Sequence, residues 1–137
     1  MRTLSIVAVA ILTAACAAHQ PTGDVRTMSG MDMYQQLCAS CHGVNGKGDG
    51  PVAPLIKIHV PDLTRLALRN GGEFPTEDVR RTIDGRFERP AHGPRDMPVW
   101  GWQFYDSSDP DDAAERARVD SMISRLVEYV RSIQVQQ

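Results

Sequence analysis

Cys38-Ala39-Ser40-Cys41-His42 is the stretch on which the interpretation of this 137-residue chain depends. Two cysteines separated by two small residues can form a redox dithiol or hold half of a zinc site. With the histidine that follows, they can instead attach a haem. Each chemistry needs a different surrounding fold, so the remaining sequence discriminates among the three.

The first two chemistries find little support outside this motif. A thioredoxin-like dithiol lies between a strand and a helix of an alternating fold, and no period-2 run is long enough for a strand. A tetrahedral zinc site takes four ligands, as two close pairs in the common spacing patterns. Beyond the motif the domain offers His59 and His92, which do not form a second pair. The sequence therefore gives only weak support to a zinc site.

Haem attachment needs fewer assumptions. Two thiols three residues apart on one helical turn can each form a thioether with a haem vinyl group, and His42 can then ligate the iron. A second axial ligand is expected from elsewhere in the chain. Met97 lies in the segment RDMPVWGWQF (95–104), has a soft thioether, and is followed by Pro98, which stiffens the backbone.

Other residues fit the second ligand position less well. Met28, Met31 and Met33 precede Cys38 too closely in sequence to wrap around the ring. Met122 falls on the apolar face of the last predicted helix and is expected in the core. His59 and His92 are expected in surface or hydrogen-bonded structural roles, and His92 is the reserve ligand.

The N-terminal segment predicts export. Residues 1–15 contain one arginine and an apolar run too short for a comfortable membrane span, as in a signal peptide. Cys16 follows this run. It is either lipidated, as in bacterial lipoproteins, or removed by cleavage after Ala17; we favour lipidation because it gives the odd third cysteine a role. Residues 16–28 predict a flexible tether, and residues 29–137 the folded domain. We therefore expect a periplasmic, membrane-anchored lipoprotein.

Composition limits the other possibilities. The length suits one domain with a modest core. The formal net charge of -2, with scattered positive residues, gives no basis for nucleic-acid binding. Aromatic residues make up only 6% of the chain, so a large buried cofactor would supply bulk that the side chains lack.

The apolar pattern predicts helices throughout the domain. We expect helices over residues 30–41, 63–69 and 77–84, capped by Ser29, Asp62 and Thr76. Residues 86–104 predict a long structured loop. The last helix begins at the cap Asp109 with Pro110 in its first turn. Its apolar face has three- and four-residue spacing and comprises Val119, Met122, Ile123, Leu126, Val127, Val130 and Ile133.

With these motifs the chain resembles the monohaem class I cytochromes c that have an MPxWG ligand loop, a branch that also supplies cytochrome domains of cbb-type oxidases. The resemblance rests on CASCH (38–42), on MPVWG (97–101) and on paired end helices, and covers residues 30–133. It implies an all-α fold of three to five helices wrapped around one covalently bound haem, with the first and last helices crossing. The crossing residues it implies are Gly30, Tyr34, Leu126 and Tyr129.

The resemblance also implies further site residues. A proline carbonyl should accept a hydrogen bond from His42; Pro51 matches best and Pro54 is a rival. Trp100 and Trp102 are expected to line the pocket. Arg86, Arg89 and Arg95 either neutralise haem propionates or form a solvated surface. The acidic stretch DSSDPDDAAE (106–115) departs from the family pattern, and we interpret it as a solvated helix start.

The implied function is one-electron transfer between redox protein partners, by a monomer that is not an enzyme. The cofactor is one haem c, bound through Cys38 and Cys41 with His42 and Met97 as axial ligands. Two alternatives remain open. One is a haem enzyme or gas sensor with a labile sixth ligand, and the other is a tethered subunit of an oxidase or dehydrogenase complex.

Overall fold

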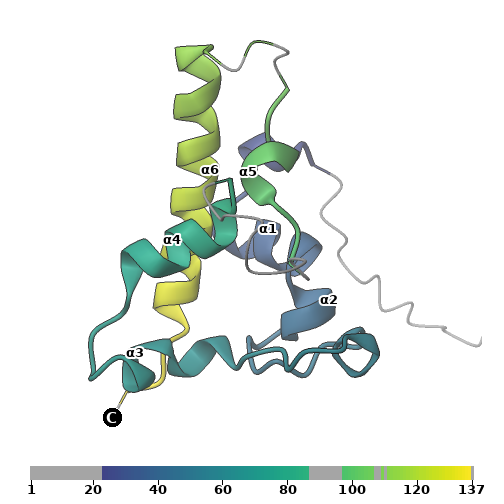
Figure 1. Ribbon diagram of the computed structural model, residues 1–137, viewed down its shortest axis with the longest axis vertical. Coiled ribbons are helices and arrows are strands. Elements are labelled where there is room, and N and C mark those ends of the chain that lie inside the picture. The colour runs from purple at the N-terminus through teal and green to yellow at the C-terminus, as the bar shows by residue number, and fades with distance from the viewer. Residues whose placement is uncertain (1–22, 87–96, 107–108, 110, 137) are drawn as a thin grey trace, which may run out of the picture.

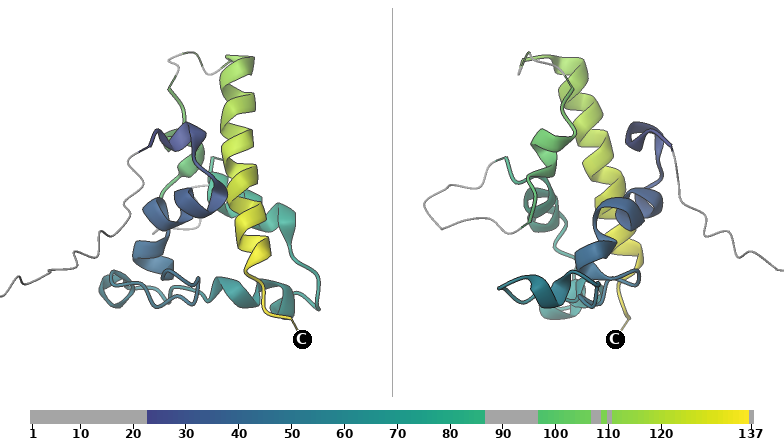
Figure 2. Two further views of the ribbon diagram at one scale, coloured as in Figure 1. Left: turned by 180° about the vertical axis from the view of Figure 1, so that it is seen from behind. Right: turned by 90° about the vertical axis from the view of Figure 1, so that its right-hand side faces the viewer.

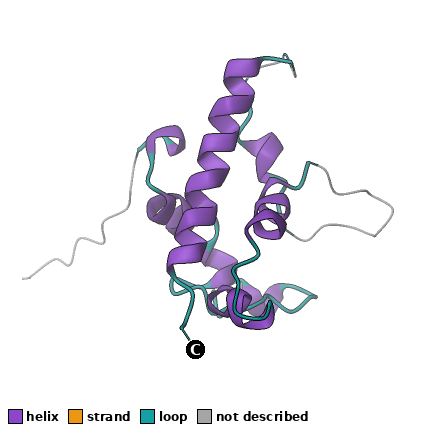
Figure 3. Cartoon of the chain, turned by 90° about the vertical axis from the view of Figure 1, so that its left-hand side faces the viewer, coloured by secondary structure: helices purple, strands orange, loops and turns teal. Residues whose placement is uncertain are grey.

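The computed structural model describes residues 23–86, 97–106, 109 and 111–136. Within these ranges the regular structure consists of six α-helices and three 3-10 helices, without a strand (Figure 3). The elements in chain order are η1 (Val25–Thr27), α1 (Gly30–Leu37), α2 (Ala39–His42), η2 (Ala53–Leu55), η3 (Leu63–Arg65), α3 (Leu66–Arg69), α4 (Thr76–Asp84), α5 (Trp100–Gln103) and α6 (Ala113–Ser132). The predicted all-α fold is confirmed. It has six α-helices among the described residues, one more than the upper limit of the three to five that the resemblance implied.

The long helix α6 organises the fold (Figures 1 and 2). Helices α1 and α4 both pack against it. The segment from α2 to α3 crosses near its C-terminal end, where Gln134 Nε2 donates to Leu63 O at 2.7 Å and Val135 N donates to Thr64 O at 2.9 Å. No helix among the described residues is long and apolar enough to cross a membrane.

The core lies along the predicted apolar face of α6. Six of its seven predicted positions are buried, and the seventh, Ile133, is only partly buried because it forms the C-cap. Met33 and Tyr34 of α1 are buried against this face. Met122 is fully buried, which confirms its predicted place in the core.

Helices α1 and α6 cross at the residues that the resemblance implied. A Cβ atom built on Gly30 would lie 2.1 Å from the carbonyl oxygen of Arg125, so no larger residue fits without a shift. Beside this contact the rings of Tyr34 and Tyr129 pack with their centroids 5.0 Å apart. Leu126 is buried at the same crossing.

The first predicted helix is broken into two. The cap is correct, since Asp32 N donates to Ser29 Oγ at 3.1 Å. The helix does not continue to Cys41, however, because the backbone turns at Cys38, whose φ of -114° departs from the helical value of about -63°. Helix α2 starts after this turn.

Two predicted caps are wrong by a few residues. Thr76 is the first residue of α4 rather than its cap, and its Oγ1 instead accepts a hydrogen bond from Arg131 Nη2 at 2.7 Å. Helix α6 is capped by Asp112, whose Oδ1 accepts from Ala114 N at 3.0 Å and Glu115 N at 3.1 Å. Asp109 forms a turn before the helix, with its carboxylate accepting from Asp111 N. The predicted cap Asp62 is correct, and accepts from Thr64 N at 2.9 Å.

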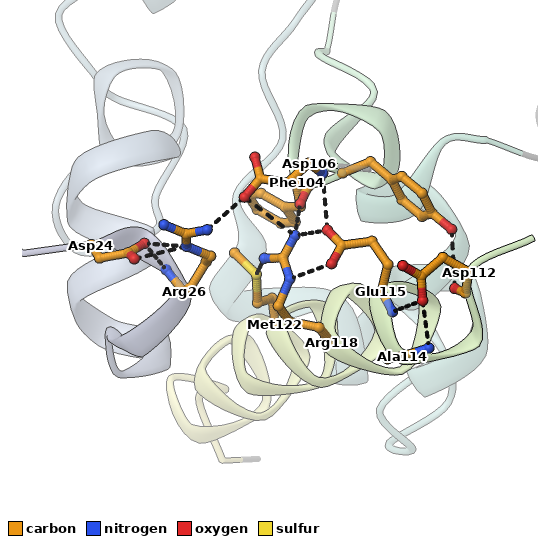
Figure 4. Close-up of polar contacts among 10 residues, drawn as sticks. Asp24, Arg26, Phe104, Asp106, Asp112, Ala114, Glu115, Arg118 and Met122 are labelled. Atoms are coloured by element: carbon orange, nitrogen blue, oxygen red, sulfur yellow. Dashed lines mark hydrogen bonds and ion pairs between the residues drawn. The ribbon is translucent and has the colours of Figure 1, made fainter. Parts of the chain in front are cut away.

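The acidic stretch before α6 belongs to a polar network rather than to a solvated helix start alone (Figure 4). Arg118 donates to the Glu115 carboxylate and to Phe104 O. Asp106 N donates to Glu115 Oε1 at 2.9 Å, and the Asp106 carboxylate accepts from Arg26 Nη1 at 2.6 Å. The network joins η1, the segment after α5 and the first turns of α6.

This network predicts an acid-dependent loss of stability. The hydrogen bond from Arg118, helped by that from Asp106 N, lowers the pKa of Glu115 from its ordinary 4.5 to about 2. A carboxyl group with a lowered pKa stabilises the fold above its unfolded pKa and loses that contribution as it is protonated. The melting temperature of Glu115→Gln should therefore lie below that of the wild type above pH 4.5, and the two should converge between pH 4.5 and 2.

A matched control is Glu128→Gln, which removes an exposed partner of Arg131 on the same helix. Exposed ion pairs of this kind contribute little. The expected melting temperature of this variant follows that of the wild type at every pH. The role of the network would be contradicted if both variants lowered the melting temperature equally. It would also be contradicted if the melting temperature of Glu115→Gln still lay below that of the wild type at pH 2.

Candidate functional site

One cavity of about 390 Å³ brings together five of the residues that the sequence singled out. Its volume lies within the roughly 300–1,000 Å³ typical of cofactor pockets. The wall is formed by α1, α2, α4, the segment 56–63, the Met97 segment and α6, and is mostly apolar. The predicted site residues on it are Cys38, Cys41, His42, Met97 and Trp100.

The loop after α2 folds back and holds the CASCH segment. The backbone N–H groups of three alternate residues in this loop donate to carbonyls of α2: Gly48 N to His42 O at 2.8 Å, Gly50 N to Cys41 O at 3.1 Å, and Val52 N to Ser40 O at 2.9 Å. These bonds satisfy helix-end carbonyls that would otherwise lack partners. The last turn of α2 is therefore fixed, although the helix is only four residues long.

Cys38 and Cys41 lie beside the cavity, Cys38 at the N-cap of α2 and Cys41 within that helix. Burial, together with the charge of Cys41, raises the pKa of Cys38 to about 12. A raised pKa keeps the Cys38 thiol protonated and makes it a poor nucleophile, so Cys38 does not suit the attacking role in a redox dithiol. In the described part of the chain, no three His, Cys, Asp or Glu side chains gather as a metal cluster would require.

His42 is held by a proline carbonyl, but not by the predicted one. Its Nδ1 lies 3.4 Å from Pro61 O. Because a carbonyl oxygen can only accept, this contact assigns the proton to Nδ1 and leaves Nε2 with the lone pair. Burial also lowers the pKa of His42, which favours the neutral imidazole that ligates metals.

The assignment of this carbonyl to Pro51, or to Pro54, is wrong. Both residues are exposed and neither lines the cavity. Further along the chain, Leu63 N donates to Gly46 O at 2.7 Å. This bond holds the segment before η3 next to the loop that follows α2. This long-range bond brings Pro61 to His42.

Met97 lines the cavity together with Pro98 and Trp100, although it lies far from the CASCH segment in sequence. The Trp100 ring stacks on the buried Phe104 with centroids 5.7 Å apart, which fixes the segment that follows Met97. Trp102 does not line the cavity, contrary to prediction, and is 57% exposed. On a four-residue helix, positions 100 and 102 cannot share one face.

Several residues at the site were not foreseen. Pro61, His59 and the α4 residues Val79 and Ile83 all line the cavity. The apolar spacing of α4 weakly indicates that Val79 and Ile83 face the interior. No pattern in the neighbouring sequence indicates that His59 or Pro61 lines a cavity. Arg86 points elsewhere and pairs with Asp84. The predicted candidates Arg89, Arg95 and His92 lie outside the described residues.

The residues present fit a covalently attached haem. The cavity offers an apolar wall for a macrocycle, two thiols on one side, a neutral imidazole and a thioether. Thiol, imidazole and thioether are the groups that c-type haem attachment and His/Met ligation use.

Comparison with known proteins identifies the family. Residues 28–134 match the Cytochrome c family, and the chain belongs to it. The chain is 28% identical over 114 residues to the "Cbb3-type cytochrome c oxidase subunit CcoP" of Rhodobacter capsulatus, an alignment that covers 83% of this chain and 31% of that subunit. The same subunit from a particular strain of that species is 27% identical over 115 residues, with the same coverage.

The match is partial in length. The chain spans about a third of the curated relatives it matches, 31% of each. No solved structure matches the chain. The family membership establishes a haem-bearing electron-transfer domain related to the cytochrome domains of cbb3-type oxidases.

Proposed function

We propose that the protein is a one-electron carrier with a single haem, bound covalently through Cys38 and Cys41 and ligated by His42 and Met97. The observation that carries this proposal is the cavity that unites the CASCH segment with the distant Met97 segment. Such a haem supplies an iron that accepts and releases one electron. If His42 and Met97 both held the iron, no position would be left for a substrate, so we propose an electron carrier and not an enzyme.

The chain's own residues have distinct roles in this proposal. Cys38 and Cys41 anchor the group. Pro61 O keeps the proton on His42 Nδ1, so that Nε2 is the ligating nitrogen. Met97 supplies a soft thioether, which favours a raised reduction potential. The apolar wall excludes water and adds to this effect.

Covalent attachment is tested by intact mass after denaturation. The wild type is expected to carry the added mass of one haem. Cys38→Ala and Cys41→Ala should each weaken attachment to one thioether, and the double variant should lose the haem to acid–acetone extraction. Wild-type protein that gives up all its haem to extraction would contradict the proposal.

We also propose a periplasmic location with a lipid anchor on Cys16. Support comes from the short apolar N-terminal segment and from the position of the third cysteine directly after it. The mass of the mature N-terminal peptide tests this. A diacylglyceryl-modified Cys16 is expected, and a mature chain that begins after Cys16 would exclude the anchor.

An exposed apolar surface near the cavity suits the docking of redox partners. Leu55 is 81% exposed and Ile58 is exposed while also lining the cavity. Small interfaces are typical of transient electron-transfer complexes. We therefore propose a partner that presents an apolar patch to this surface.

The variant Leu55→Asp should slow electron transfer to a small redox protein with an exposed apolar patch about tenfold, a loss of roughly 1.4 kcal/mol in docking. Its spectrum and reduction potential should match the wild type. Met31→Asp, at an exposed apolar residue of α1 away from the cavity, is the matched control. Equal rates for the two variants would remove the docking surface from the proposal.

A second candidate function is that of a cytochrome subunit in a larger complex. The similarity to the CcoP subunit of a cbb3-type oxidase favours it. Mild detergent extraction followed by affinity purification of the tagged chain tests it. Stoichiometric recovery of other oxidase subunits would support the candidate, and a chain that purifies alone would support a free carrier.

A further inference from the structure

A buried ion pair lies between α4 and α5, outside the cavity. Asp84 is 5% exposed, and the Arg86 side chain is 12% exposed. Arg86 Nε donates to Asp84 Oδ1 at 2.5 Å and its Nη2 donates to Oδ2 at 3.0 Å. Two parallel bonds of this kind give a geometrically defined contact.

The pair lies where the chain leaves α4. Asp84 is the last residue of that helix, and Gly85 ends it with a φ of 68°, in the left-handed region. The adjacent Ile83 is buried and lines the cavity. The ion pair is therefore joined directly to one wall of the proposed haem site.

The same pair contacts the chain where it returns with Met97. A Cβ atom built on Gly101 would lie 1.9 Å from Asp84 Oδ1 and 2.5 Å from Arg86 Nε. The backbone of α5 thus packs directly on the ion pair. The need for this close approach explains why a glycine follows Trp100.

The Arg86 guanidinium makes two further contacts around α5. Its Nη2 lies 3.7 Å from an Asp120 carboxylate oxygen on α6. Its Cζ lies 6.0 Å from the centroid of the exposed Trp102 ring. The guanidinium therefore links the end of α4, helix α5 and the middle of α6.

We propose that the Asp84–Arg86 pair is a positioning device that holds Met97 at the cavity. This inference rests on the proposed role of Met97 as a ligand. The pair fixes Gly101, Trp100 stacks on Phe104, and Met97 lies three residues before Trp100 on the same wall. A thioether ligand held by a loop binds only as firmly as the loop is fixed by its supporting contacts.

The experiment uses the haem-loaded protein and three variants. Arg86→Gln removes the ion pair, and Gly101→Ala displaces α5 from it. Arg81→Gln is the matched control, since it breaks the exposed Arg81–Glu77 pair on the same helix. For each we would measure the rate of carbon monoxide binding to the reduced protein, the reduction potential, and the thioether-to-iron absorption band of the oxidised protein.

The expected result is at least a tenfold faster reaction with carbon monoxide in Arg86→Gln and Gly101→Ala, with a weakened thioether band and a lower potential. Arg81→Gln should match the wild type in all three. If Arg86→Gln melts earlier but keeps the wild-type band, potential and resistance to the gas, the pair is merely structural and the inference is overturned.

Two further outcomes are distinguishable. If the wild type itself reacts readily with carbon monoxide, the proposed ligation by Met97 fails, and the inference fails with it. If Arg86→Gln does not assemble, Arg86→Lys keeps the charge without the two-point contact. An intermediate rate in Arg86→Lys would support the inference, and a wild-type rate would overturn it.

Discussion

Met97→Ala is expected to convert the reduced protein from one that does not react with carbon monoxide into one that binds it rapidly. Alanine offers no donor atom, so the position that the thioether fills becomes accessible to a small ligand. Loss of the thioether should also lower the reduction potential by on the order of 0.1 V, well within the roughly 0.8 V that axial ligands can span. Optical spectroscopy and redox titration measure both effects.

The control for this variant is Met31→Ala, because Met31 is exposed on α1 and does not line the cavity. It should leave the spectrum, the potential and the resistance to carbon monoxide unchanged. If Met97→Ala also resists the gas, another residue is the ligand. His59, which lines the same cavity, would then be the first to substitute.

Gly30→Ala is expected to destabilise the fold by about 3 kcal/mol, near the upper end for an added methyl group in a packed region. The new Cβ would lie 2.1 Å from the carbonyl oxygen of Arg125, and backbone cannot move aside as a flexible side chain can. Alanine favours helices over glycine by only about 1 kcal/mol, so the clash dominates. Denaturant unfolding measures the loss.

Gly23→Ala is the matched control for that variant. A Cβ at Gly23 would meet only the end of the Met28 side chain, at 3.8 Å, which is ordinary contact. Its unfolding curve should overlie that of the wild type. A Gly30→Ala protein as stable as this control would show that the two helices do not need their close crossing.

The crossing of the end helices at Gly30 and Tyr34 was implied by the family resemblance and not by any pattern in this sequence alone. The burial of the α6 face, in contrast, could be predicted from the sequence, because its apolar residues repeat at helical spacing. The helix starts were less certain. Asp109 and Asp112 have the same capping chemistry, and only the path of the preceding chain, tied by Arg118 and Glu115, selects the second.

The site could be predicted where the type of the residue itself indicates its chemical role. The CASCH segment and Met97 stand out by residue type, and the structure brings them to one cavity. The support around them could not be foreseen. Pro61 reaches His42 through a long-range backbone bond, and Gly101 meets Asp84 only because α4 and α5 pack together. Such contacts leave no periodic trace in the sequence.

The central claim is a covalently bound haem whose two axial positions are both filled by the chain. The most direct test is the optical spectrum of the dithionite-reduced wild-type protein, recorded before and after carbon monoxide is added. We expect the spectrum of a c-type haem, unchanged by the gas. A marked shift on addition of the gas would mean an open sixth position, and a haem enzyme or gas sensor would replace the electron carrier.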